Sequence, residues 1–168
     1  MRIQTARLIL RPIENADMEQ MLVLLTDEMI KKTYMIPDFA SREEAIRLAE
    51  RFAALSHDAS RVVVGIVREE KIIGFINDVG IEDGEIELGY ALHPEYHGQG
   101  LMTEALGALI NQLFESGYHR VVAGAFESNE ASLRVMEKCG MQKMEKTDRI
   151  AYRGQEHTCL YRVIEREK

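Results

Sequence analysis

The glycine loop His97-Gly98-Gln99-Gly100 has the residue types and the place in the chain that suit anion binding. It follows an alternating, strand-like segment, residues 85–92, and precedes apolar residues at helical spacing that end at Gly117. A strand, a loop and a helix in this order present free backbone N–H groups to an anion, and the helix macrodipole adds positive potential there. The glycines matter because a Cβ would hinder close approach to a phosphate. We therefore predict that residues 97–102 cradle a pyrophosphate.

Two other nucleotide-binding motifs fit this chain poorly. No GxxxxGK[ST] sequence occurs, which excludes a P-loop. Gly98 and Gly100 begin a dinucleotide fingerprint, but Thr103 stands at its third glycine, and such a unit normally opens its domain. A nucleotide-binding regulator would need an acidic ribose contact about 20 residues after the loop. The chain offers only Glu115 there, within the expected helix, so this reading ranks last.

Two motifs resemble landmarks of the GNAT acyltransferase superfamily. Residues 87–90 (Glu-Leu-Gly-Tyr) together with residues 97–102 resemble its acetyl-CoA signature. Asn129-Glu130-Ala131-Ser132, followed by residues 137–141, resembles its N-x-x-S…EK-x-GF motif. The opening residues 5–12 also fit the branch that acetylates the N-termini of ribosomal proteins, the RimJ/RimL type. The resemblance covers nearly the whole chain, with departures at His97, usually Gln or Arg, and Met102, usually Gly or Ala.

Length and composition favour one ordinary globular domain, residues 1–168. The hydrophobic fraction of 46% and the charged fraction of 29% are typical of such proteins, and two cysteines are too few for a disulfide framework. The net charge of −7 argues against direct nucleic-acid binding and favours cationic partners. Because no signal peptide or bilayer-spanning run is visible, we expect a cytoplasmic protein without membrane contact.

The pattern of elements predicts an α/β fold. Three antiparallel strands, near residues 62–67, 72–79 and 85–92, precede the glycine loop. The β-branched segment 120–126 follows the next helix and is expected to lie parallel to residues 85–92. Together with the resemblance, this gives a GNAT-like mixed, largely antiparallel sheet of about seven strands with helices on both faces. Residues 31–40 lack a clear period and are expected to form a loop that contributes to specificity.

The resemblance implies which residues bind acetyl-CoA. The backbone N–H near Leu92 would polarise the thioester carbonyl. The pyrophosphate would bind to the loop, whose residues are His97, Gly98, Gln99, Gly100, Leu101 and Met102. Asn129 would also meet the cofactor, although it is equally a simple N-cap of the following helix.

The resemblance also implies two catalytic residues. Glu87 would accept the amine proton, directly or through water, although Glu85 fits the strand pattern equally well. Ser132 would protonate the leaving thiolate, because Met136 stands where many GNAT enzymes have a tyrosine. A second glutamate of the ribosomal-protein branch has no counterpart, since its nearest position is Ala151. Glu145 and Glu156 lie nearby in the sequence, but neither is assigned this role.

The function expected from this resemblance is acetyl transfer from acetyl-CoA to a primary amine by direct attack in a ternary complex. The preferred acceptor is the N-terminal α-amine of a protein, such as a ribosomal protein. The alternatives are a small amine (a polyamine, aminoglycoside or amino acid) and a non-catalytic CoA-binding module. The histidines lack metal-ligand spacing, so no metal is expected. The oligomeric state stays open between monomer and homodimer.

Overall fold

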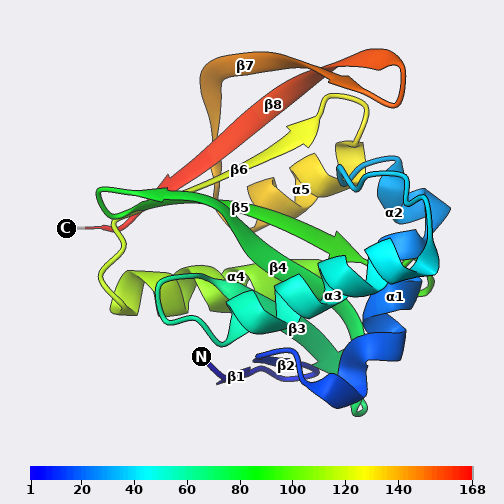
Figure 1. Cartoon of the computed structure of the whole chain (residues 1–168). Helices are drawn as coiled ribbons and strands as arrows, with labels where there is room; N and C mark the ends of the chain where they lie inside the picture. Colours follow the sequence, from blue (N-terminus) through cyan, green and yellow to red (C-terminus); the bar gives the residue numbers. More distant parts are fainter. Residues whose placement is uncertain (168) are drawn as a thin grey trace. The chain divides into compact units, whose positions relative to one another are not determined.

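The structure is a computed structural model that describes residues 1–167, and its fold is mixed α/β (Figure 1). The strands are β1 (Ile3–Gln4), β2 (Ile9–Arg11), β3 (Val63–Arg68), β4 (Lys71–Glu82), β5 (Glu85–Leu92), β6 (Arg120–Phe126), β7 (Gln142–Tyr152) and β8 (Gln155–Glu165). The helices are α1 (Met18–Thr26), α2 (Glu28–Lys31), α3 (Arg42–Ser56), α4 (Leu101–Glu115) and α5 (Glu130–Lys138), with 3-10 turns η1 (Asn15–Asp17) and η2 (Pro94–Tyr96). The predicted mixed, largely antiparallel architecture is confirmed. The described residues contain eight strands instead of about seven, because the N-terminal segment forms two short strands.

The chain divides into two compact units. The first comprises residues 1–78 and 90–101, and the second comprises residues 79–89 and the chain from Met102 onward. The strands β4 and β5 each contribute residues to both units. The expectation of a single domain over residues 1–168 stays a prediction.

In the first unit, β2 pairs antiparallel with β1 and β3, and β3 pairs antiparallel with β4. The turn from β3 to β4 uses Glu69 and Glu70 at φ of 49° and 66°, the two successive positive φ values of a tight hairpin. The helices α1 and α3 bury small and branched side chains against these strands, around the fully buried ring of Phe75. The segment after α2 forms an irregular loop as predicted, and Tyr34 Oη donates to Asn77 Oδ1 on β4 at 2.6 Å.

In the second unit, β5 pairs parallel with β6, and β6 and β7 both pair antiparallel with β8. The predicted parallel pairing of residues 85–92 with 120–126 is therefore confirmed. The connection between them contains α4, which buries Leu106, Leu109 and Leu113 at helical spacing. The long β7–β8 hairpin, drawn in orange to red in Figure 1, turns at Arg153 and Gly154, both at positive φ. No described helix combines the length and the apolar character needed to cross a bilayer.

Candidate active site

The glycine loop has the backbone conformation that its sequence predicts. Gly98 and Gly100 both have φ of 72°, a region that side chains with a Cβ rarely adopt. A Cβ at Gly98 would meet no atom within 4 Å, and one at Gly100 would meet only Arg7 Nη2, at 3.7 Å. The loop therefore presents open space at both glycines, which fits a phosphate close to the backbone.

The two ends of the glycine loop are fixed by local contacts. The His97 ring places Nε2 2.8 Å from the Leu92 carbonyl oxygen, across the η2 turn that ends β5. The side chains of Leu101 and Met102, which begin α4, are buried, at 1% and 6% exposure. The bulk of Met102 is therefore packed inside the protein.

Two arginines that the sequence analysis did not select hold the glycine loop. Arg7 Nη1 donates to the Gln99 carbonyl oxygen at 2.9 Å, and Arg68 Nη1 donates to Gln99 Oε1 at 3.0 Å. They come from residues far from the loop in sequence, before β2 and at the end of β3. Their guanidinium groups add positive charge beside a loop suited to an anion, in a chain of net charge −7.

In the second unit, Glu87 lies partly buried on β5. Burial raises the pKa of its carboxyl, Lys146 opposes that rise, and Asp148 and Glu85 add to it. Glu85 itself forms an ion pair with Arg120 at 3.2 Å. The two glutamates that the strand pattern could not separate thus differ, since Glu85 has a direct cationic partner in Arg120.

A carboxylate that sequence reasoning missed, Asp148 on β7, shares the sheet face of Glu87. Glu87 on β5 lies opposite Val122 on β6, and Gly124, two residues further along β6, lies opposite Tyr161 on β8. Cys159, two residues before Tyr161, lies opposite Asp148 on β7. Residues paired across strands, and residues two apart along one strand, point to the same face. Tyr161 Oη donates to Asp148 Oδ2 at 2.7 Å, and burial, with this bond, raises the pKa of Tyr161. The sequence did not identify Asp148, because the resemblance indicated position 151, three residues later.

The N-x-x-S motif forms the start of α5. Asn129 Oδ1 accepts a hydrogen bond from the Ser132 backbone N–H at 3.2 Å, so Asn129 is the N-cap. Met136 is fully buried in the following turn. Burial raises the pKa of Cys139, at the end of this helix, to about 11, so its thiol stays protonated at neutral pH. These facts leave the cofactor role of Asn129 and the catalytic role of Ser132 as predictions.

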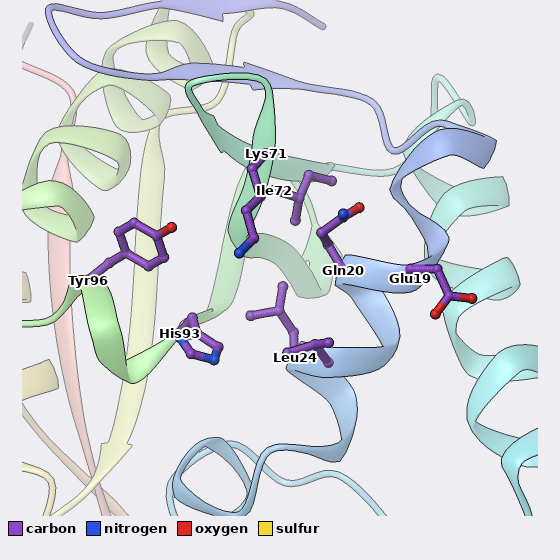
Figure 2. A pocket seen from close by; sticks show the side chains of 8 residues that line it. Glu19, Gln20, Leu24, Lys71, Ile72, His93 and Tyr96 are labelled. Carbon is purple, nitrogen blue, oxygen red and sulfur yellow. The ribbon is translucent and has the colours of Figure 1, made fainter.

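One pocket of about 190 Å³ lies in the first unit, between α1, the start of β4 and the η2 turn. Figure 2 shows Lys71, His93 and Tyr96 around it, with Leu24 and Ile72 as apolar walls. None of the predicted site residues lines it, although His93 and Tyr96 belong to the turn before the glycine loop. Among residues 1–167, no group of three or more His, Cys, Asp or Glu side chains is placed to hold a metal.

Comparison with known proteins gives one family. A family model described as an acetyltransferase (GNAT) domain matches residues 7–142. The N-acetyltransferase YoaA of Bacillus subtilis is 31% identical over 146 residues, which cover 84% of this chain and 82% of YoaA.

Solved structures agree in fold. The GNAT acetyltransferase of Bacillus anthracis superposes with a TM-score of 0.84 at 24% identity, covering 98% of both chains. RimL, a ribosomal L7/L12 α-N-protein acetyltransferase in complex with coenzyme A, superposes with a TM-score of 0.88 at 20% identity, again covering 98% of both chains. With a family model that spans most of its length, this chain belongs to the GNAT family and is an N-acetyltransferase.

Proposed function

We propose that this enzyme transfers the acetyl group of acetyl-CoA to the N-terminal α-amine of a protein, with ribosomal proteins as the model acceptor. The observation that carries the proposal lies on one strand. Partway along β5 is Glu87, a partly buried carboxylate with a raised pKa, and the strand then runs into the glycine loop. A candidate base and a candidate phosphate-binding loop therefore belong to one continuous stretch of chain. The likeness to RimL, described as an α-N-protein acetyltransferase in complex with coenzyme A, supports this choice.

The donor would bind to the glycine loop. The open space at Gly98 and Gly100 fits the pyrophosphate, and the first N–H groups of α4 add donors and a favourable dipole. Arg7 and Arg68 keep Gln99 in place and add positive charge for the phosphates of coenzyme A. Bound acetyl-CoA supplies a thioester as the acyl donor. In this proposal the backbone N–H of Leu92 polarises the carbonyl, and Asn129 caps α5 beside the cofactor.

Glu87 would remove the proton that the amine must lose, and Ser132 would return one to the leaving thiolate. The raised pKa of Glu87 brings the carboxylate closer to the basicity that proton removal needs. An α-amine with a pKa of about 7.7–8.0 costs about 1–1.4 kcal/mol to neutralise at pH 7, whereas a lysine side chain costs about 4.6 kcal/mol. A single carboxylate therefore suits an α-amine better than a lysine.

The test offers a basic peptide with a free N-terminus and the same peptide with a blocked N-terminus that keeps its lysines. Release of free thiol from acetyl-CoA reports turnover, and mass spectrometry locates the acetyl group. We expect acetylation of the free peptide at its α-amine and little on the blocked one. Faster acetylation of the blocked peptide, or activity on polyamines, aminoglycosides or amino acids alone, would assign a small-molecule or lysine acceptor. Acetyl-CoA binding without turnover on any acceptor would indicate a non-catalytic module.

A further inference from the structure

The side chains of Asp148 and Tyr161 form a cation-binding arrangement on the sheet face of Glu87. Tyr161 lies across β6 at Gly124, where a Cβ would come within 2.8 Å of Tyr161 Cε1, so only glycine admits the ring in this position. The hydroxyl of that ring holds Asp148 by a 2.7 Å hydrogen bond. A carboxylate beside an aromatic face is a favourable combination for an ammonium or guanidinium group.

A cation of the protein itself occupies this place. Lys146 Nζ lies 4.4 Å from the centroid of the Tyr161 ring and 3.8 Å from Asp148 Oδ2. The Lys146 and Asp148 side chains are 51% and 48% exposed, so neither is sealed from an incoming molecule. An ion pair between half-exposed side chains contributes little to stability, so its displacement costs little.

The same place lies within electrostatic reach of the proposed base. Lys146 and Asp148 are the two side chains, after burial, that most affect the carboxyl of Glu87, and Tyr161 responds to Glu87 in turn. A molecule that presents its reactive amine to Glu87 therefore has Asp148 nearby for a second positive group.

We propose that Asp148 and the Tyr161 ring bind a cationic side chain of the acceptor, close to its N-terminus, and that Lys146 holds this place until the acceptor displaces it. The proposal rests on the proposed function and names its acceptor class more closely: polypeptides with arginine or lysine soon after the first residue. It also gives Asp148 a role. The second glutamate of the ribosomal-protein branch has no counterpart at Ala151, and Asp148 supplies a carboxylate on the same strand. Lys146 then lowers the apparent affinity of the acceptor, because it competes for Asp148.

The experiment compares two peptides with free N-termini that differ at residues 2–4, where one has arginine and the other has the neutral, near-isosteric citrulline. Neither side chain can be acetylated, so all turnover comes from the α-amine. For the wild-type enzyme we expect kcat/KM to favour the arginine peptide by about tenfold, the effect of one charge-assisted contact. Asp148→Asn should reduce this preference to less than about twofold, and Tyr161→Phe, which keeps the ring but frees Asp148, should reduce it partly.

Matched variants separate this site from general charge effects. Glu145→Gln removes an exposed carboxylate from the same strand and should keep the preference. Lys146→Met should raise kcat/KM for the arginine peptide severalfold, whereas Lys143→Met, another exposed lysine of β7, should not. Acetyl-CoA affinity in calorimetry should stay unchanged in all of them.

Three outcomes would overturn the inference. The first is a preference for the arginine peptide that survives in Asp148→Asn. The second is an equal loss of kcat/KM on both peptides in that variant, and the third is an unchanged kcat/KM for the arginine peptide in Lys146→Met. In each case α-amine acetylation would continue and the proposed function would stand. Failure of the proposed function looks different, because neither peptide would be acetylated by the wild-type enzyme while acetyl-CoA binding or turnover of small amines remained.

Discussion

The glycine loop and the sheet face around Glu87 are two regions built in opposite ways. The loop consists of consecutive residues whose backbone adopts positive φ at Gly98 and Gly100, with two arginines bound to Gln99. The sheet face takes its polar groups from three strands, β5, β7 and β8, and these groups are side chains (Glu87, Lys146, Asp148 and Tyr161). The loop offers N–H groups and positive charge, whereas the face offers carboxylates.

This difference suits two separate roles, donor binding at the loop and acceptor binding and proton transfer at the sheet face. Coenzyme A is anionic and an amine acceptor is cationic, so a net charge of −7 cannot favour both over the whole surface. Two arginines, Arg7 and Arg68, contact the loop, whereas the carboxylates of Glu87 and Asp148 lie on the sheet face. Substitutions in the loop should then change donor affinity, and substitutions on the face should change turnover and acceptor choice.

The largest expected effect belongs to the sheet face. Glu87→Gln should lower kcat by about 10²–10⁴-fold, because the proposed general base is lost, while acetyl-CoA affinity stays within about twofold. A raised pKa in the folded state stabilises the fold below the unfolded-state pKa, and this stabilisation is lost as pH rises through the folded pKa. At pH 7 the ionised Glu87 therefore does not support the fold, and the variant should melt no lower than wild type. Steady-state kinetics, calorimetry and thermal melts measure the three quantities.

Glu85→Gln is the matched control for Glu87→Gln, since Glu85 lies on the same strand in an ion pair with Arg120. It should keep kcat within a fewfold of wild type. A larger loss in Glu85→Gln than in Glu87→Gln would transfer the base role to Glu85 and contradict our assignment.

The second effect belongs to the glycine loop. Gly100→Val should weaken acetyl-CoA binding by about 100-fold or more, because a β-branched residue does not tolerate φ of 72° and its side chain would occupy the space proposed for the phosphate. Gly80→Val is the control, since Gly80 lies on β4 without a positive φ and a Cβ there would meet no atom within 4 Å. Calorimetry measures both affinities, and circular dichroism checks the fold. Undiminished binding in Gly100→Val would remove the loop from the donor site.

The same contrast explains what the sequence could predict. The glycine loop could be predicted because its residues are contiguous in the sequence, and the periodicity on either side located β5 and α4. The tight turns were readable for the same reason: Asp83-Gly84 adopts two successive positive φ values, 48° and 79°. Local signals of this kind require only neighbouring residues, so one sequence contains them.

The sheet face was readable only in part, because it depends on register. Glu87 was selected through a family motif, but Asp148 and Tyr161 meet only when the β7–β8 hairpin fixes which residues lie opposite each other. Strand β7 carries an irregularity between Lys143 and Thr147, and such a shift changes the face to which later residues point. The family position Ala151 therefore did not identify Asp148. Arg7 and Arg68 could not be predicted as loop contacts, because they are separated from Gln99 by 92 and 31 positions in the sequence.

A smaller effect is expected at Ser132. Ser132→Ala should lower kcat by about tenfold without changing acetyl-CoA affinity, since a thiolate with a pKa near 8.5 needs only modest help to leave. Asn129→Ala removes the cap bond to the Ser132 N–H and should cost about 1 kcal/mol of stability. Kinetics with thermal melts distinguish the two roles. A Ser132→Ala enzyme that turns over like wild type would mean that water protonates the thiolate.

The smallest effect concerns the pKa of Glu87, and it tests whether the sheet face acts as one electrostatic unit. Burial raises this pKa above the ordinary value of 4.5, Lys146 lowers it, and Asp148 and Glu85 raise it. Cys159 and Tyr161 also interact with Glu87, but burial raises the pKa of both, so both are neutral at acidic pH. Asp148→Asn removes a negative neighbour, which makes ionisation of Glu87 easier. Lys146→Met removes a positive neighbour, which makes it harder.

The two variants should therefore move the pKa of Glu87 in opposite directions, each by less than about one pH unit at these partly exposed positions. Carbon-detected NMR titration of the labelled carboxyl measures the shift directly, without interference from the pKa of the acceptor amine. The acid limb of kcat should follow it, to lower pH in Asp148→Asn and to higher pH in Lys146→Met, because only the ionised carboxylate accepts a proton. Glu145→Gln, on the same strand but absent from the groups that affect Glu87, should leave both unchanged. An unchanged pKa in the first two variants would mean that burial alone sets it. In that case the side chains of the β7–β8 hairpin would not influence the carboxyl of Glu87. The two regions would then differ only in that the loop acts through its backbone and the sheet face through the burial of Glu87.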